Sequence, residues 1–397
     1  MSSKFILLLI LGVDAFILLV QASNISLSYT EALVLYGEPS FLQFLLNQTI
    51  SIFGQNDLVV HSLMISFHLG SLLLLYLISK EYIKQEKNRL WLIIVFALLP
   101  GVVSSAVVVN SAGIIIFGLL LFIYLHNRVP QYILNILLFT YAIMDISFSY
   151  LFLGLFLYYW KADKKQIAYY MLVLYAISLF VYGLDSIGLP SGHFLDTIGI
   201  YSAIFTPIIF IYIVYVLYRR YLLSQKDIIW YISTPILILS LLLSFRQRIP
   251  VEHFAPYLII ALPLAAQTFI HSYRVRLKLF RFRYKFIFTL SFIFLLVNTF
   301  VVLFNKELYL VLENPKKHFA YNMHVAKELS NVLKEKGIKC VTTDNKMQLR
   351  LRFYGIDSCN TNILQEKSLT SKANVNVTIR YKNKTLYKAN VTNVNKT

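Results

Sequence analysis

Residues 286–317 read FIFTLSFIFLLVNTFVVLFNKELYLVLENPKK, and the character of the chain changes within this stretch, near residue 305. Residues 286–304 carry no charged side chain, whereas lysine, glutamate and asparagine recur from residue 305 onwards. A helix of about 20 apolar residues crosses a bilayer core. The stretch therefore predicts a last membrane span followed by a small domain outside the membrane. We expect a membrane domain over residues 1–305 and a C-terminal α/β domain over residues 306–397.

Similar apolar segments recur through the first 305 residues. Hydrophobic residues make up 58% of the chain and charged residues 14%, against about a quarter charged in soluble domains. The net charge of +18 lies beside apolar segments, which favours membrane orientation over nucleic-acid binding. The sequence thus predicts a polytopic α-helical membrane protein with about eleven spans. These spans are expected over 5–22, 58–78, 90–108, 112–125, 132–160 (two short helices divided near Asp145), 167–184, 198–218, 228–244, 257–270 and 286–304.

The loops between these spans predict the orientation. Lysine and arginine gather in alternate loops, the last of which is RVRLKLFRFRYK at 274–285. Short loops rich in lysine and arginine stay in the cytoplasm. We therefore expect an inner (plasma) membrane protein with a cytoplasmic N-terminus and a periplasmic or extracellular tail. Cys340 and Cys359, the chain's two cysteines, then lie in an oxidising compartment where they either form a disulfide or remain unpaired thiols.

The tail contains one helical pattern and several strand patterns. Residues 324–337, HVAKELSNVLKEKG, have a helical apolar period that ends at Gly337, a residue suited to a helix C-terminus. Short strands are expected at 339–344, 349–355, 375–381 and 384–391.

The first exterior loop, residues 23–57, is long and moderately polar. Two amphipathic pieces at 30–37 and 40–53 predict helices lying in the membrane interface. Glu31 begins the first piece. A partly desolvated carboxylate has a raised proton affinity and suits a general base, although a glutamate here could instead only stabilise a helix N-terminus.

A second exterior loop, SFRQRIPVEHFAPY at 244–257, places Arg246, Arg248 and His253 close together. Arginine binds phosphate through forked, charge-assisted hydrogen bonds, and exterior arginines run against the usual distribution of charge. A donor phosphate site is one interpretation, and anchoring to lipid head groups is the other. Glu252 could orient one arginine or could simply be solvated.

Further polar residues lie in other exterior loops. Asp185, His193 and Asp196 occur in the glycine-rich segment 183–199, and Asp145 lies between two short helices. His193 could bind phosphate or a metal, or serve only a structural hydrogen bond, and Asp145 could be a helix cap or a site residue. A divalent metal is possible, but no His, Asp and Glu spacing supports a particular ligand set.

The order of these motifs resembles that of the GT-C membrane glycosyltransferases, in the branch of the protein O-mannosyltransferases and the lipid A aminoarabinose transferase. The matching elements are Thr30-Glu31-Ala32, Tyr36, Glu38-Pro39, Phe53-Gly54 and the basic loop running into Tyr257 and Pro263. The family's aspartates are replaced by Thr30 and, in Val109-Asn110-Ser111-Ala112, by a segment without a carboxylate.

This resemblance implies transfer of a sugar from a polyprenyl-phosphate donor to a glycan, lipid or protein acceptor outside the membrane. A direct in-line attack on the anomeric carbon would invert its configuration, since one displacement occurs. The resemblance implies Glu31 as the catalytic base and Arg246, Arg248 and His253 as ligands of the donor phosphate. The remaining pocket candidates are Tyr36, Glu38, Asp145, Asp185, His193, Asp196 and Tyr257. The alternatives are a lipid or polysaccharide transporter or flippase, which would carry broken helices and charges at mid-span, and a non-catalytic envelope assembly protein. The charges cluster at one face, which favours the enzyme.

Overall fold

A computed structural model describes residues 3–183, 191–366 and 375–393 of the chain. The chain divides into two compact units. The first contains residues 1–18 and 64–299, and the second contains residues 19–63 and 300–397. Each unit is described by itself below.

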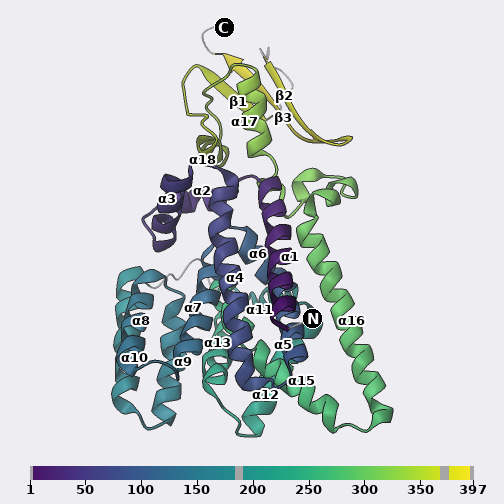
Figure 1. Ribbon diagram of the computed structural model, residues 1–397. Helices are drawn as coiled ribbons and strands as arrows, with labels where there is room; N and C mark the ends of the chain where they lie inside the picture. The colour runs from purple at the N-terminus through teal and green to yellow at the C-terminus, as the bar shows by residue number, and fades with distance from the viewer. Residues whose placement is uncertain (1–2, 184–190, 367–374, 394–397) are drawn as a thin grey trace. The chain divides into compact units, whose positions relative to one another are not determined.

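Helices make up the first unit (Figure 1). Two helices shared with the second unit, α1 (Ser3–Asn24) and α4 (Asp57–Tyr82), contribute to it. Its other helices are α5 (Glu86–Ala97), α6 (Pro100–Val107), α7 (Ser111–Leu125), α8 (Gln131–Met144), α9 (Phe148–Lys161), α10 (Lys165–Tyr182), α11 (Phe194–Phe205), α12 (Pro207–Leu222), α13 (Ile228–Ser244), α14 (Val251–Ile259), α15 (Leu262–Val275) and most of α16 (Lys278–Leu303).

Several of these helices are long and apolar enough to cross a membrane. Among the described residues there are five, namely α1, α4, α10, the stretch Val251–Val275 and α16, and seven if each of two bent pairs is one span. The chain is therefore a multi-pass membrane protein. The total is below the eleven expected partly because α7, α8 and α13 are apolar but only 14 to 17 residues long.

Two expected spans are broken in the structure. The span predicted over 90–108 divides into α5 and α6, which meet at 63°, and the span predicted over 198–218 divides into α11 and α12, which meet at 104°. Pro100 and Pro207 each stand at the first turn of the second helix. Proline has no backbone N–H and disfavours the helical conformation of the residue before it, so each helix restarts at its proline. Thr206, the residue before Pro207, has φ of 65°, a backbone conformation that β-branched residues rarely adopt.

The expected division near Asp145 is confirmed, since α8 ends at Met144 and α9 begins at Phe148. The backbone N–H of Ser147 donates to Asp145 Oδ1 at 2.8 Å, a turn in which the side chain replaces a backbone acceptor. The basic segment 274–285 was expected to be a loop, but α16 starts within it at Lys278. Leucine, arginine and lysine are good helix formers, and this segment has no glycine or proline to stop the helix.

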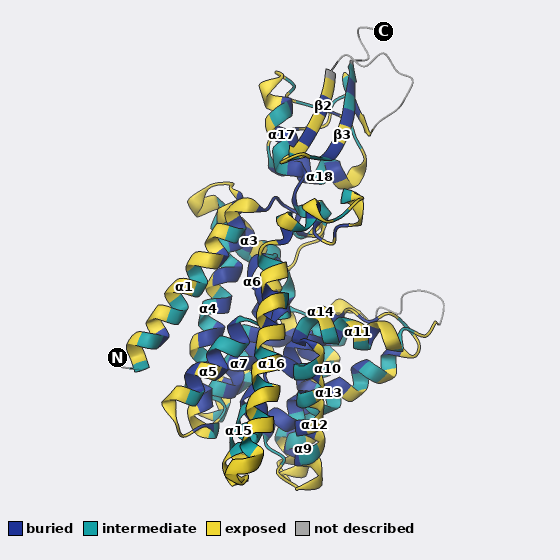
Figure 2. Ribbon diagram, turned by 90° about the vertical axis from the view of Figure 1, so that its right-hand side faces the viewer, coloured by how far each residue is buried: buried dark blue, intermediate teal, exposed yellow. Residues whose placement is uncertain are grey.

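The interior of the first unit is packed closely around α7, α9 and α13. Gly154 of α9 shows how closely, because a Cβ there would lie 2.8 Å from the backbone oxygen of Tyr231 in α13. By contrast, α1 and α16 expose much of their apolar surface (Figure 2). Exposed apolar helix faces of this kind suit contact with lipid.

The second unit joins the loop after α1 to the tail. It contains α2 (Tyr29–Tyr36), α3 (Phe41–Phe53), α17 (Ala326–Glu335), α18 (Asn345–Phe353) and three short 3₁₀ helices (Asn305–Leu310, Pro315–Lys317 and Tyr321–Met323). A three-stranded antiparallel sheet has the order β1-β3-β2, from β1 (Asn362–Glu366), β2 (Val375–Tyr381) and β3 (Lys384–Asn393). Leu329, Leu333 and Leu351 pack with Val377 and Val391 in its core.

The helix expected at 324–337 is present as α17, with Gly337 at φ 73° just beyond its end. The strands expected at 375–381 and 384–391 are β2 and β3. The strand expected at 349–355 was wrong, because this segment belongs to α18. Met347, Arg350 and Leu351 are buried, which is helical spacing, and Asp344 accepts the N–H of Met347 as an N-cap. The strand expected at 339–344 is reduced to isolated bridges at Cys340 and Thr342.

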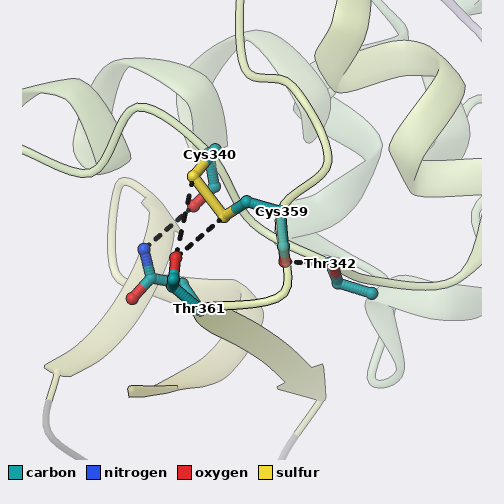
Figure 3. Close-up of a disulfide and its surroundings, with 5 residues drawn as sticks. Cys340, Thr342, Cys359 and Thr361 are labelled. Carbon is teal, nitrogen blue, oxygen red and sulfur yellow. Dashed lines mark hydrogen bonds between the residues drawn. A yellow bond between two sulfur atoms is a disulfide. The ribbon is translucent and has the colours of Figure 1, made fainter. Parts of the chain in front are cut away.

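The tail contains a disulfide between Cys340 and Cys359 (Figure 3), which is the pairing the sequence allowed. The Thr361 hydroxyl lies 3.3 Å from Cys359 Sγ, and the Asn362 amide donates to the Cys340 carbonyl at 3.1 Å. The bond thus ties the segment before α18 to the segment that leads into β1.

Replacing both cysteines by serine should loosen the tail without preventing membrane insertion. Closing a loop of sequence separation 19 stabilises the folded state by about 3 kcal/mol in the chain-entropy model. Amide protection in the core of the tail should therefore fall by roughly 100-fold if exchange there follows unfolding of the tail. Mass-spectrometric hydrogen exchange on full-length protein measures this, with α7 as an internal reference. Two free thiols in wild-type protein purified without reductant would contradict the bond.

Candidate functional site

Glu31 lies in the first turn of α2 and forms a capping box with Ser28. The Ser28 N–H donates to Glu31 Oε2 at 2.7 Å, and the Glu31 N–H donates to Ser28 Oγ at 3.3 Å. The sequence Ser-x-x-Glu satisfies two otherwise unpaired N–H groups in this way. The structural role considered for Glu31 from the sequence is therefore present. The side chain is fully buried, with 0% exposure.

His61 of α4 is a titratable neighbour of Glu31. Its Nδ1 lies 3.6 Å from Glu31 Oε1, and neither side chain is exposed. Among the described residues, both ring nitrogens of His61 lack a hydrogen-bond partner. A buried imidazole without such partners is costly, so the arrangement suggests a role other than packing. Sequence reasoning missed His61, although a histidine near the start of an apolar span is itself a signal.

Tyr36 and Glu38 follow at the end of α2. Burial raises the pKa of the Tyr36 phenol, and the Arg352 guanidinium lies over its ring at 4.6 Å. Glu38 is exposed. Tyr36 thus packs against α18, and Glu38 faces outward.

Three of the predicted residues meet in the first unit. Ser147 Oγ donates to Asp145 Oδ1 at 2.6 Å and also contacts His253 Nδ1. His253 Nδ1 lies 3.8 Å from Asp145 Oδ1, and the Tyr257 hydroxyl donates to the Ser147 carbonyl at 2.6 Å. Asp145 therefore caps a turn and also lies beside His253. Tyr257 is fully buried, and its hydrogen bond to the Ser147 carbonyl stabilises this turn.

The hydroxyl of Ser147 contacts Nδ1 of His253 and so determines that Nε2 is the ring nitrogen directed away from Ser147. A serine hydroxyl has one donor, and it is used on Asp145, so Ser147 Oγ accepts from His253 Nδ1–H. The opposite nitrogen, Nε2, then remains for a ligand. It accepts a hydrogen bond when the ring is neutral and donates one when the ring is protonated.

The segment containing His193 pairs with the arginine loop. The Ser191 N–H donates to the Arg246 carbonyl at 3.0 Å, and the His193 N–H donates to the Ser244 carbonyl at 2.8 Å. The rings of Phe194 and Phe245 stack at 4.6 Å. Two loops that are far apart in the sequence are therefore held side by side.

The His193 ring is engaged on both sides. Its Nδ1 lies 3.1 Å from Asp196 Oδ2, and its Nε2 lies 2.8 Å from Ser191 Oγ. This is the geometry of a structural histidine, the plainer of the two interpretations. Asp185 lies outside the described residues.

Arg246 and Arg248 have exposed side chains. Within the described part of the chain, neither guanidinium forms an ion pair or a hydrogen bond, and Glu252 forms no ion pair with them. Their N–H groups are thus directed to solvent and can meet an anion. Across residues 3–183, 191–366 and 375–393, no three His, Cys, Asp or Glu side chains gather closely enough to hold a metal ion.

A further polar pair lies in the middle of two apolar helices. Asp14 of α1 and His68 of α4 approach to 2.7 Å between Oδ2 and Nε2, and their side chains are 16% and 3% exposed. The expectation that charges avoid mid-span was wrong here. The pair could be recognised only in three dimensions, because 54 residues separate its members.

Comparisons with known proteins bear on the fold. No protein-family model matches the chain, and no curated protein sequence matches it. The structure is similar to that of ArnT from Cupriavidus metallidurans, crystallised in the apo state, with a TM-score of 0.59 and 10% sequence identity. The match covers 100% of this chain and 99% of the ArnT chain. The chain therefore has an ArnT-like fold along its whole length.

Proposed function

We propose that this protein is a membrane glycosyltransferase of the GT-C type, which moves a sugar from a polyprenyl-phosphate-linked donor to a hydroxyl or amine acceptor. The observation that carries the proposal is the end-to-end ArnT-like fold. The motifs that resemble GT-C enzymes, from Glu31 to the basic loop before Tyr257, support it independently. The loops rich in lysine and arginine support a cytoplasmic N-terminus and chemistry on the exterior face. We further propose a plasma-membrane location with about eleven spans.

In this proposal, the donor phosphate is bound by Arg246, Arg248 and His253. When the bond between the anomeric carbon and the phosphate oxygen breaks, the phosphate keeps the electron pair and gains negative charge. Positive groups placed at that oxygen stabilise the transition state. The two exposed guanidinium groups supply this charge, and protonated His253 adds an Nε2–H donor whose direction is set by Ser147 and Asp145.

Glu31 is the proposed base. The acceptor oxygen or nitrogen forms a bond to the anomeric carbon as the donor bond breaks, and its proton passes to the Glu31 carboxylate. One displacement inverts the anomeric configuration. Because Glu31 is fully buried beneath its capping box, an acceptor reaches it only after α2 shifts. His61, 3.6 Å away, is placed to take the proton onwards.

A transporter or flippase remains the second candidate function, and a specific observation favours it. Asp14 and His68 form a polar pair within apolar helices, and two expected spans are broken. Intramembrane ionisable pairs and broken helices are frequent in transporters.

One assay separates the two. Purified protein in lipid nanodiscs is incubated with a panel of polyprenyl-phosphate-linked sugars and with extracted envelope glycans and lipids as acceptors. Release of polyprenyl phosphate together with a labelled acceptor supports the transferase. If no donor is consumed, and reconstituted protein instead moves the intact lipid-linked sugar across a vesicle bilayer, the transporter interpretation replaces it.

A further inference from the structure

The second unit contains a cleft that the proposed chemistry does not use. Its volume is about 350 Å³, within the range of small-molecule sites. It is lined by one side of α17, the end of α18 and the start of α4 with the residues just before it. Its polar lining includes Gln55, Asp57, Lys327, Asn331, Lys334 and Arg352.

One carboxylate and one ammonium group in this cleft neutralise each other. Asp57 Oδ2 lies 2.9 Å from Lys327 Nζ, and Asp57 is almost fully buried. The Tyr354 hydroxyl donates to the other Asp57 oxygen and itself accepts the N–H of Leu27. Burial raises the pKa of Tyr354 above its usual range, so Tyr354 stays a donor to Asp57. Both oxygens of Asp57 are thus used in contacts within the protein, and its negative charge is neutralised by Lys327, so it does not repel a bound anion.

Two cations remain. Among the described residues, neither Lys334 nor Arg352 forms an ion pair. The Arg352 guanidinium is stacked on the Tyr36 ring at 4.6 Å, a contact that orients its plane and leaves its N–H groups at the edge. Lys334 Nζ lies 3.9 Å from the position that a Cβ on Gly355 would occupy. The Lys334 ammonium group therefore lies beside Gly355, which also lines the cleft.

We propose that this cleft binds an oxyanion of the phosphate class, held by the Arg352 guanidinium and the Lys334 ammonium. The forked N–H donors of an arginine match the spacing of phosphate oxygens. A lysine ammonium adds electrostatic attraction to the phosphate without requiring a particular orientation. The side-chain amide of Asn331 can add a hydrogen bond, whereas the Gln55 amide already donates to the Phe353 carbonyl at 2.6 Å. The phosphate could belong to a soluble sugar phosphate or to a lipid head group.

The test measures binding, so it is independent of any transfer activity. Full-length protein in nanodiscs of phosphatidylcholine is titrated by calorimetry with inorganic phosphate, glucose 6-phosphate and glucose. We expect the two phosphates to bind, glucose not to bind, and affinity to fall as salt is raised. Lys334→Gln and Arg352→Gln should each weaken phosphate binding at least tenfold.

The matched control is Lys339→Gln, an exposed lysine of the same unit that is not part of the cleft lining, and it should bind like wild type. Nanodiscs containing phosphatidylglycerol identify the source. If they abolish glucose 6-phosphate binding, the site holds a lipid head group, and if they do not, it holds a soluble phosphate. Absence of phosphate binding by wild-type protein, or binding unchanged in both variants, would overturn the proposal.

Discussion

Replacing Glu31 by glutamine should slow sugar transfer roughly 10²–10⁴-fold, the usual cost of losing a general base. Glutamine has nearly the same size and still offers an oxygen to the Ser28 N–H, so the capping box survives. Donor affinity should stay within a few fold of wild type, because Glu31 is assigned to the acceptor. The measurement is transfer from a polyprenyl-phosphate donor by purified protein, with donor binding followed separately.

Ser28→Ala is the control that separates catalysis from capping. It removes the hydroxyl that accepts the Glu31 N–H and should cost about 1 kcal/mol of stability, while the carboxylate remains. If Glu31 served only as a cap, Ser28→Ala would be the more harmful change and Glu31→Gln would be silent. Full activity in Glu31→Gln would move the base elsewhere, with Asp145, Asp185 and Asp196 as the next carboxylates to test.

The sequence predicted the elements whose signal is local. Apolar stretches located α1, α4, α7, α10, α13 and α16, whereas the domain boundary near residue 305 stays a prediction. Residues 132–160 were too long for a single span, which led to the division found at Asp145. Gly337 predicted the end of α17, and two cysteines in a predicted exterior domain allowed the disulfide that is present.

The errors arose where one pattern suits two structures. LRLRFYG alternates apolar and charged residues like a strand, yet Asp344 caps the segment and Leu351 completes a helical apolar face with Met347. Apolar residues continue on both sides of Pro100 and Pro207 without a change of composition. The prolines themselves are therefore the main signal in the sequence for the two bends. Ser28-x-x-Glu31 did carry the signal of a capping box, which favours the structural role of Glu31 that was only an alternative.

The side-chain pairs of the candidate site, and the polar pair between α1 and α4, could not be predicted because they are made by tertiary packing. Ser147 and His253 are 106 residues apart, and Asp14 and His68 are 54 apart. Nothing in the sequence around His61 shows that the helix bearing it passes beside Glu31. Polar residues within apolar spans identified candidates, but only their placement shows which partner each one has.

Removing the charge of the exterior arginine loop should affect donor binding and turnover together. Arg246→Ala and Arg248→Ala should each cost about 2–4 kcal/mol of transition-state stabilisation, the value of a charge-assisted contact to phosphate, or roughly 30- to 1000-fold in kcat/KM. Donor affinity should fall as well, since the ground-state phosphate is already negative. Lysine at either position should restore activity only in part, because it keeps the charge but loses the forked geometry.

The control for this prediction is Arg283→Ala, which removes an equally exposed arginine from the basic segment that begins α16. It should leave transfer unchanged if position, and not total charge, matters. His253→Gln tests the imidazole in the same assay, and Ser147→Ala should reproduce part of its effect, because the Ser147 hydroxyl orients the ring. If the arginine variants keep full activity and lose only attachment to anionic vesicles, the loop is a lipid anchor, and the donor phosphate is bound by other residues.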